Sequence, residues 1–87
     1  MEIRQLKYFV ATAESLNFSE AAKRNYITQS TLSQQIKQLE NEMGVQLFER
    51  NNRSVFLTEA GEELLPFAIN AIHAVDNCKQ RIMDLQH

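Results

Sequence analysis

The 87-residue chain has little cysteine, glycine or proline and no long apolar run, and each of these shortages excludes a class of protein. Its one cysteine, Cys78, cannot form an internal disulfide or share a zinc ion with a second cysteine. A small secreted domain stabilised by disulfides is therefore disfavoured, and the composition suits a reducing cytoplasm. Two glycines and one proline exclude collagen-like and Pro/Gly-rich disordered chains. The longest unbroken apolar run, Tyr8 to Ala11, is far shorter than the roughly 20 residues that span a bilayer. We therefore expect one small cytoplasmic domain, with at most an appendage and no membrane segment.

The charge of the chain is low and unevenly placed. The formal net charge is −2, whereas DNA-binding domains are usually basic overall. Residues 1–58 nevertheless hold seven basic and six acidic side chains, whereas residues 59–87 hold two and five. Two windows, residues 21–39 and 50–58, contain basic residues and no acid. Because the local field decides what a binding face attracts, the total charge is only a weak objection to a nucleic-acid partner.

Two helices are expected at the start of the chain. In residues 3–15 the apolar side chains recur at helical spacing and form one stripe. A short second helix is expected at residues 20–24, with Ser19 as its N-cap, because a serine hydroxyl accepts a hydrogen bond from the first turn. Glu20 follows in that turn, where the helix dipole favours a negative charge.

A third helix is expected at residues 29–43. Thr28 is its predicted N-cap, and Gly44 is predicted to close it in the left-handed conformation. Its apolar positions follow steps of four, three and four residues, so one face should point into the core. The members of that face are Leu32, Ile36, Leu39 and Met43.

The rest of the chain predicts a β-hairpin and one long helix. Short apolar-rich runs at residues 46–50 and 54–57 flank Asn51-Asn52-Arg53, and asparagine tolerates the positive φ of a tight turn. Thr58 then caps a helix that runs to near the C-terminus. The fold class is therefore mainly α: a winged helix-turn-helix, with three helices and a two-stranded β wing, followed by a long linker or dimerisation helix. The expected division is a DNA-binding domain at residues 1–58, with its helix-turn-helix at about 18–37 and its wing at about 46–57, and a linker helix at residues 59–87.

The face of the third helix opposite the apolar one is polar and carries no acid before Glu40. In a recognition helix, an amide can pair with adenine, a hydroxyl with a base or a phosphate, and a lysine with a phosphate or guanine. An ordinary solvated face would mix Glu with Lys, so DNA binding is the favoured interpretation. The candidate residues on and beside this face are Thr28, Gln29, Ser30, Thr31, Ser33, Gln34 and Lys37.

Other candidate sites carry weaker signals. Arg53 at the hairpin tip could enter a narrow minor groove, although an exposed turn arginine is often simply solvated. Ser19 could sit beside a phosphate, a role compatible with capping. His73 and His87 have no carboxylate or cysteine partner at ligand spacing, and no nucleophile motif or Gly-rich phosphate loop is present. We expect no metal, no cofactor and no enzymatic activity.

The segment from Phe18 to Leu65 resembles the N-terminal DNA-binding region of LysR-type transcriptional regulators. The shared positions are Ala21-Ala22, Thr28-Gln29-Ser30, Leu32-Ser33-Gln34-Gln35-Ile36, Leu39-Glu40, Gly44-Val45, Leu47-Phe48-Glu49-Arg50 and Leu57-Thr58-Glu59-Ala60-Gly61. Residues 3–13 also match the family's first helix, so the resemblance covers essentially the whole chain. It implies a bacterial regulator that binds an inverted-repeat promoter site as a dimer.

The resemblance also implies roles for the elements. The helix-turn-helix reads the major groove, the wing contacts the minor groove, and the long helix dimerises and leads to a C-terminal effector-binding domain. The base-reading positions it implies are Gln29, Ser30, Ser33 and Gln34, with Arg53 on the wing. Many members have Pro at position 30, where this chain has Ser30 and so lacks that rigid residue at the start of the helix. Many also have Arg at position 34, so Gln34 of this chain favours an adenine contact over a guanine or phosphate contact. The effector-binding domain, and with it any small-molecule effector, is absent from these 87 residues; we expect a piece of a longer regulator, for which a tetramer is an open alternative.

The long final helix predicts a dimer interface. At 1.5 Å per residue it would be about 42 Å long, more than a three-helix domain can cover. Two interleaved series seven residues apart form a heptad seam. The interface residues we expect are Leu64, Ala68, Ala71, Ile72, Val75, Cys78, Ile82 and Leu85. The competing partner is the first helix of the same chain, which should cover the part near Leu64 and Leu65.

Two other classes of function fit the sequence less well. A winged-helix module that binds protein would explain the acidic total and the long apolar helix, but the third helix presents a polar face where such a module would carry an apolar patch. A small enzyme has no residues to carry its chemistry. Double-stranded DNA is the partner that the sequence favours.

Overall fold

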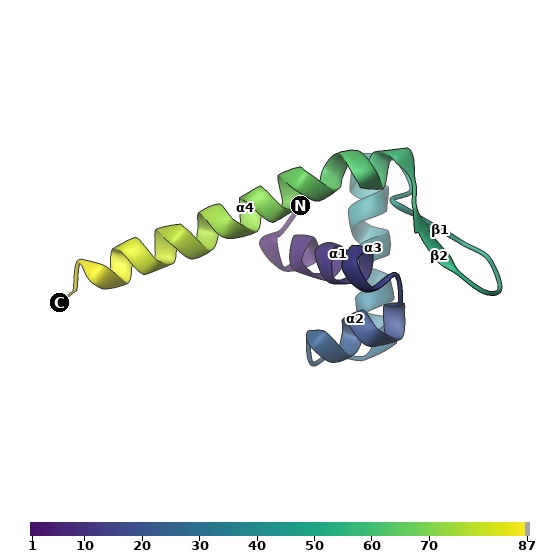
Figure 1. The fold of residues 1–87 in the computed structure, drawn as a ribbon, viewed down its shortest axis with the longest axis horizontal. Helices are drawn as coiled ribbons and strands as arrows, with labels where there is room; N and C mark the ends of the chain where they lie inside the picture. Colours follow the sequence, from purple (N-terminus) through teal and green to yellow (C-terminus); the bar gives the residue numbers. More distant parts are fainter. Residues whose placement is uncertain (87) are drawn as a thin grey trace.

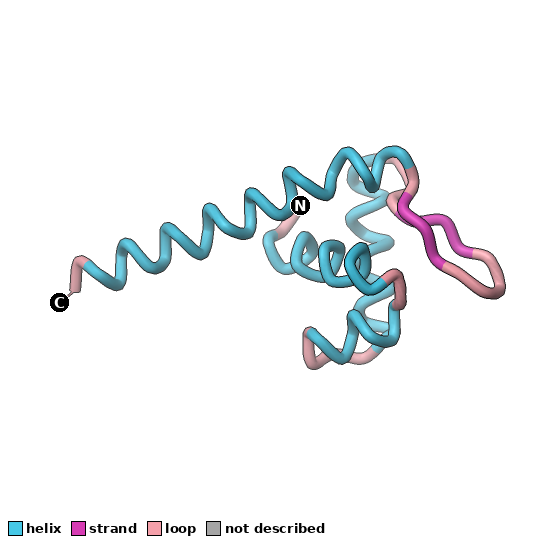
Figure 2. The backbone as a smooth tube through the Cα atoms, in the orientation of Figure 1, coloured by secondary structure: helices cyan, strands magenta, loops and turns pink. Residues whose placement is uncertain are grey.

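The computed structural model describes residues 1–86, which form four helices and a two-stranded antiparallel sheet. In chain order the elements are α1 (Ile3–Ser15), α2 (Phe18–Arg24), α3 (Gln29–Met43), β1 (Phe48–Arg50), β2 (Val55–Leu57) and α4 (Glu59–Asp84). Figure 1 shows α1, α2 and α3 packed together, the hairpin on one side and α4 leaving on the other. Figure 2 shows how short the strands are beside the helices. The predicted class, a mainly helical winged helix-turn-helix with a long final helix, is confirmed.

The core lies where the three short helices meet the base of the wing. Its fully buried large apolar side chains come from α1, α3 and the segment before β1: Phe9, Leu32, Ile36, Leu39 and Leu47. Phe48 of β1 extends the core, with its ring centroid 5.4 Å from that of Phe9 and 5.7 Å from that of Phe18. Tilted and edge-on aromatic pairs at these distances add to the free energy gained by burying the rings. The wing is therefore anchored to the helices by an aromatic cluster.

Three helix ends are formed as the sequence predicts. Thr28 Oγ1 accepts a hydrogen bond from the Thr31 amide at 3.1 Å, and Gly44 closes α3 with a φ of 73°. Thr58 Oγ1 accepts from the Gly61 amide at 3.0 Å and donates to the Gln46 carbonyl at 2.7 Å. These caps satisfy amides that the helices leave unpaired and fix where α3 and α4 begin.

Gly61 marks the closest approach of α4 to the wing. A Cβ atom at this position would collide with the carbonyl oxygen of Leu47 and lie 2.7 Å from Leu57 Cδ2. The same Leu47 carbonyl accepts a hydrogen bond from the Thr58 amide at 3.0 Å. The first turn of α4 is thus locked onto the base of the wing.

The prediction that Ser19 caps α2 is wrong. The helix begins two residues earlier, at Phe18, and Asn17 is the N-cap, with Oδ1 accepting from the Glu20 amide at 2.9 Å. Asn and Ser are about equally good caps, so local preference does not decide between them. The earlier start buries the Phe18 ring in the core and leaves Ser19 exposed in the first turn.

Two smaller expectations also fail. Asn51 and Asn52 do not adopt positive φ; the hairpin loop is closed instead by Asn51 Oδ1, which accepts from the amides of Arg53 and Ser54, each at 2.8 Å. An asparagine side chain of this kind can replace a left-handed backbone conformation in a turn. Met43, expected in the core, is 38% exposed because it is the last residue of α3, just before the chain turns away at Gly44.

Candidate nucleic-acid interface

The polar face of α3 is held outward by the buried residues on its other side. Leu32, Ile36 and Leu39 are each at most 1% exposed, which fixes the rotation of the helix about its own axis. Across the chain, Gln5 of α1 donates from Nε2 to Gln35 Oε1 at 3.3 Å and to Gln38 Oε1 at 3.5 Å. Both apolar packing and amide contacts therefore set how α3 is presented.

The structure places the expected α3 residues together on one surface. Ser33 is half-buried, and the other members of the set are exposed: Thr28, Gln29, Ser30, Thr31, Gln34 and Lys37. No acidic residue lies among them in the first nine residues of the helix. Such a surface offers hydrogen-bond donors and acceptors with no negative charge to repel phosphates.

The polar side chains of this surface differ in whether they already make hydrogen bonds within the fold. Thr28 Oγ1 already caps the helix and donates to Thr31 Oγ1 at 2.9 Å, and it lies 3.3 Å from Ser30 Oγ. The amide side chains of Gln29 and Gln34 make no hydrogen bond within the described residues 1–86, so their donors and acceptors are available. The two glutamines are the stronger base-reading candidates of this surface.

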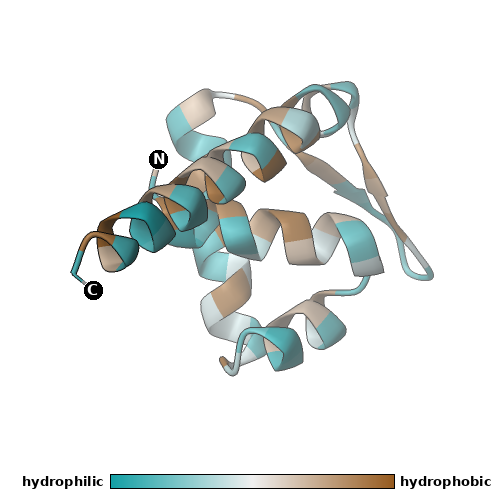
Figure 3. Cartoon of the chain, turned by 60° about the vertical axis from the view of Figure 1, so that its left-hand side comes forward, coloured by the Kyte–Doolittle hydropathy of each residue, from teal (hydrophilic) through white to brown (hydrophobic). Residues whose placement is uncertain are grey.

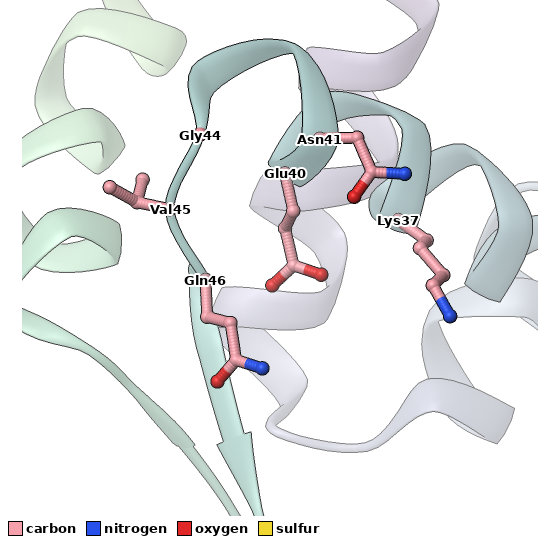
Figure 4. Close-up of a pocket in the computed structure, with 6 residues that line it drawn as sticks. All are labelled: Lys37, Glu40, Asn41, Gly44, Val45 and Gln46. Atoms are coloured by element: carbon pink, nitrogen blue, oxygen red, sulfur yellow. The ribbon is translucent and has the colours of Figure 1, made fainter.

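Glu40, the first acid of α3, is used within the fold. Its Oε2 accepts hydrogen bonds from the amides of Leu47 at 2.7 Å and Phe48 at 3.3 Å. Figure 4 shows its carboxylate between α3 and the segment that enters β1, at the edge of a cavity of about 360 Å³ that Lys37 and Gln46 also line. The carboxylate therefore joins the helix to the wing, and its charge is satisfied there.

The wing presents its cations toward solvent. Arg53 is exposed at the hairpin tip, with its backbone held by Asn51. Arg50 of β1 lies over the ring of Phe18, with its guanidinium carbon 4.1 Å from the ring centroid. The ion pairs found among residues 1–86 join Met1 to Glu42, Arg4 to Glu2 and Arg24 to Glu14, so neither wing arginine is neutralised by one of them. The acid-free window at residues 50–58 contains both arginines, but the sequence predicts a DNA contact for Arg53 alone.

The residues expected to form a dimer interface divide into two groups along α4. Leu64 and Ala68, at 9% and 1% exposed, are buried where α4 packs on α1, so the chain's own core covers them. Their positions in the heptad pattern could not reveal which helix they face. Of the remaining positions, Ala71 and Ile72 are half-buried and pack against the core, Val75 is half-buried, and Cys78, Ile82 and Leu85 are exposed. Figure 3 shows apolar and polar residues alternating along this part of the helix.

Metal-binding clusters and membrane-spanning helices are absent from residues 1–86. In residues 1–86, no three His, Cys, Asp or Glu side chains gather as a metal site would require. Within the same part of the chain, every helix is too short or too polar to cross a membrane. His73 is exposed, and His87 lies outside the described residues.

Comparison with known proteins matches this arrangement to one family. The model of the family described as bacterial regulatory helix-turn-helix protein, lysR family, matches residues 3–62. The chain belongs to the LysR family. It is 47% identical over 81 residues to the Hca operon transcriptional activator HcaR of Escherichia coli, and the aligned segment covers 93% of this chain and 27% of HcaR. It is 58% identical over 65 residues to the transcriptional regulator AlsR of Bacillus subtilis, covering 75% of this chain and 22% of AlsR.

Solved structures of LysR-family regulators share the fold of the whole chain. A CbnR DNA-binding-domain complex with DNA aligns with a TM-score of 0.92 and 38% identity, covering 100% of both chains. A complex of the BenM DNA-binding domain with the benA site 1 DNA aligns with a TM-score of 0.92 and 40% identity, covering 99% of this chain and 97% of that one. This LysR-family chain spans about a quarter of the length of the curated relatives named above, and it has the fold of the family's DNA-binding domains.

Proposed function

We propose that this LysR-family chain is the sequence-specific DNA-binding part of a bacterial, cytoplasmic transcription regulator and that it has no enzymatic activity. The observation that carries the proposal is the outward, acid-free polar surface of α3, fixed in rotation by three buried side chains and joined to the wing through Glu40. The likeness to domains solved with DNA supports it.

In this proposal α3 enters the major groove and the wing enters the adjacent minor groove. Base edges are read by Gln29, Ser30, Ser33 and Gln34, because amides and hydroxyls can pair with the donors and acceptors displayed there. Positions nearer the rims of the surface contact phosphates. These are Ser19, Thr28, Thr31 and Lys37. Arg53 reaches the minor groove, whose negative potential is greatest where A·T tracts narrow it.

The proposed DNA-bound form is a homodimer. From Val75 to Leu85 the apolar stripe of α4 lies beyond the core of residues 1–86, and the a/d spacing from Ala71 to Leu85 matches a two-helix seam. Two copies related by a two-fold axis would read the two halves of an inverted repeat. A small-molecule effector, by this proposal, acts through a part of the regulator that is not among these residues.

Binding to selected DNA tests the proposal. Duplexes enriched from a random-sequence pool by the chain, together with the DNA upstream of its own operon, are titrated by fluorescence anisotropy at a fixed salt concentration. We expect enrichment of an inverted repeat and an affinity at least about 10³-fold above that for a scrambled duplex of the same composition. Equal affinity for the two duplexes would remove sequence-specific readout from this chain.

A further inference from the structure

The turn between α2 and α3 places a tyrosine where a glycine would fit best. α2 ends in a Schellman motif, in which the Ile27 amide donates to the Ala22 carbonyl at 3.1 Å and the Tyr26 amide donates to the Lys23 carbonyl at 3.2 Å. The motif puts Tyr26 in the left-handed conformation, with a φ of 56°. That position is usually a glycine, and sometimes an asparagine, because a Cβ atom makes the left-handed conformation costly. The backbone turn therefore does not explain the tyrosine.

The ring of Tyr26 does not stabilise the fold either. The residue is 95% exposed, and its hydroxyl makes no hydrogen bond within residues 1–86. Its neighbour Ile27 is the residue of this turn that packs against the core. Backbone strain is found most often at functional positions, where it is part of how a binding group is presented. The phenol is thus held out from the turn and is available to a partner.

An unpaired cation accompanies the tyrosine. Lys23 is exposed in the last turn of α2, three residues before Tyr26. The ion pairs found within residues 1–86 do not include Lys23, whereas its neighbour Arg24 is paired with Glu14. The sequence has no acid from residue 21 to residue 39. A hydroxyl donor and an ammonium group side by side in the chain favour an anion, and a DNA phosphate accepts hydrogen bonds from both kinds of donor.

The position of this turn relative to α3 indicates which phosphate it meets. Two sugar-phosphate strands border the major groove, which is only about 12 Å wide. If α3 lies in this groove and the wing reaches the adjacent minor groove, the wing crosses one strand, and the opposite flank of α3 faces the other. Figure 2 shows the loop between α2 and α3 on that opposite flank, with the start of α3 between the loop and the hairpin. The loop is also continuous with the proposed DNA surface, which begins two residues later at Thr28.

We propose that Tyr26 and Lys23 contact a phosphate of the strand that borders the major groove on the side away from the wing. The Tyr26 hydroxyl donates to a phosphate oxygen, and the Lys23 ammonium group supplies the charge. This inference rests on the proposed function, because it needs the chain to bind duplex DNA with α3 in the major groove. The contact carries no base preference. It limits how far α3 can turn in the groove, because the wing holds the opposite side.

Tyr26→Phe removes only the hydroxyl and tests the contact directly. We expect it to weaken binding to selected and scrambled duplexes alike, by about tenfold per half-site, as for the loss of a hydrogen bond to a charged group. The salt dependence should stay the same, because tyrosine is neutral. Tyr8→Phe removes the same group from α1, outside the proposed interface, and should leave the affinity unchanged. Anisotropy titrations measure both variants.

Lys23→Gln tests the charge. Each neutralised phosphate contributes a slope of about −0.9 to the plot of log affinity against log salt, so this variant should flatten the slope by about 0.9 per protomer. Lys7→Gln is the matched control, since it removes one exposed charge from α1. A second measurement replaces single phosphates of the duplex with neutral methylphosphonates. One position per half-site, on the strand away from the wing, should weaken the wild-type chain and leave a Tyr26→Phe, Lys23→Gln double variant unaffected.

Tyr26→Gly separates a DNA contact from a role in folding. Glycine adopts the left-handed conformation without strain, so the melting temperature should rise by a few degrees. The affinity for DNA should nevertheless fall at least as far as for Tyr26→Phe. A tyrosine that serves the fold would give the reverse, with a lower melting temperature and no loss of affinity in Tyr26→Phe.

The outcomes separate this contact from the proposed function. A wild-type chain that prefers its selected duplex, with a Tyr26→Phe variant of unchanged affinity and the same methylphosphonate profile, overturns the contact and leaves sequence-specific binding standing. A tyrosine needed only when a second protein binds beside this chain also overturns it. A wild-type chain without any duplex binding overturns both proposals.

Discussion

Gln34 lies at the centre of the exposed polar surface of α3, two residues after the buried Leu32 and two before the buried Ile36. Its amide can both donate and accept, which fits the N6 and N7 edge of adenine. Because its side chain makes no hydrogen bond within residues 1–86, truncating it should change recognition and leave the fold intact.

We expect Gln34→Ala to cost about 1–3 kcal/mol of binding free energy on the selected duplex and much less on a scrambled one. Anisotropy titrations at one salt concentration measure both losses. Gln80→Ala, an exposed glutamine on α4, is the control and should leave both affinities unchanged. Equal losses on the two duplexes would assign Gln34 to a contact without sequence information.

Arg53 differs from Arg50 because nothing in the described residues holds its side chain. If it enters a narrow minor groove, Arg53→Ala should weaken binding and flatten the salt dependence, with little change in the free energy of unfolding. The loss should be larger on duplexes with an A·T tract at the wing position than on matched G·C-rich ones. The measurement is a salt series on each duplex together with a urea melt. Unchanged affinity and slope would leave Arg53 as a solvated turn residue.

At the scale of elements, the sequence was most informative where the deciding contacts are local. The predicted caps Thr28 and Thr58 are confirmed. A capping hydroxyl bonds the backbone amide only three residues further on, so the local sequence is enough to identify it. Ser19 was misassigned because Asn17 and Ser19 compete equally until the burial of Phe18 is known. That burial depends on β1, about 30 residues away in the chain, which no local pattern reports.

The same distinction applies to the candidate site. The polar surface of α3 could be predicted because its complement, a buried apolar ridge, lies in the same helix. The cleft between the wing and α2, which Arg50 lines, could not, since it forms only when the hairpin meets the start of α2. The dimer interface expected on α4 stays a prediction, because a heptad pattern marks an apolar seam but does not say which helix covers it; in the structure Leu64 and Ala68 are buried within the chain.

The junction of α4 and the wing offers a test of how these elements are coupled. Gly61→Ala should destabilise the chain by about 1–3 kcal/mol, because the added methyl group must displace the Leu47 carbonyl or the Leu57 side chain. This loss is expected although alanine favours a helix interior over glycine by up to about 1 kcal/mol. Urea unfolding followed by circular dichroism measures it.

Gly44→Ala is the comparison for this prediction. Its Cβ would meet nothing within 4 Å, so any cost there comes from the positive φ alone. A Gly61→Ala variant as stable as the wild type would show that α4 is not locked to the base of the wing.

At the scale of the whole molecule, the extents of 52 × 25 × 19 Å reflect a small domain with a helix projecting from it. The far end of α4 carries exposed apolar side chains, with Ile82 53% and Leu85 80% exposed. An apolar stripe on a projecting helix is best stabilised by a second helix of the same kind. Phe67, 69% exposed on the same helix, adds apolar surface that the sequence did not single out.

We expect the wild-type chain to sediment as a dimer at tens of micromolar, roughly the concentration at which a modest interface assembles. Val75→Glu and Ile82→Glu should each shift it to monomer, because a carboxylate would be buried in the seam without a partner. Both should lower affinity for a duplex with two half-sites and leave a single half-site nearly unaffected.

Asn77→Glu adds the same charge to α4 outside the seam and should change neither property. Sedimentation velocity and anisotropy on the two duplexes provide the measurements. A monomeric wild-type chain at these concentrations would contradict the dimer.

The lock between Gly61 and the base of the wing has a mechanical consequence for such a dimer. Because the first turn of α4 packs against the base of the wing, the 26 residues of the helix form a lever about 39 Å long. Changing the crossing angle of two such levers at their far ends by about 10° changes the distance between the two DNA-reading ends by about 7 Å, or roughly two base-pair steps of 3.4 Å. The distance between half-sites would then be a readout of the angle at which the two levers cross.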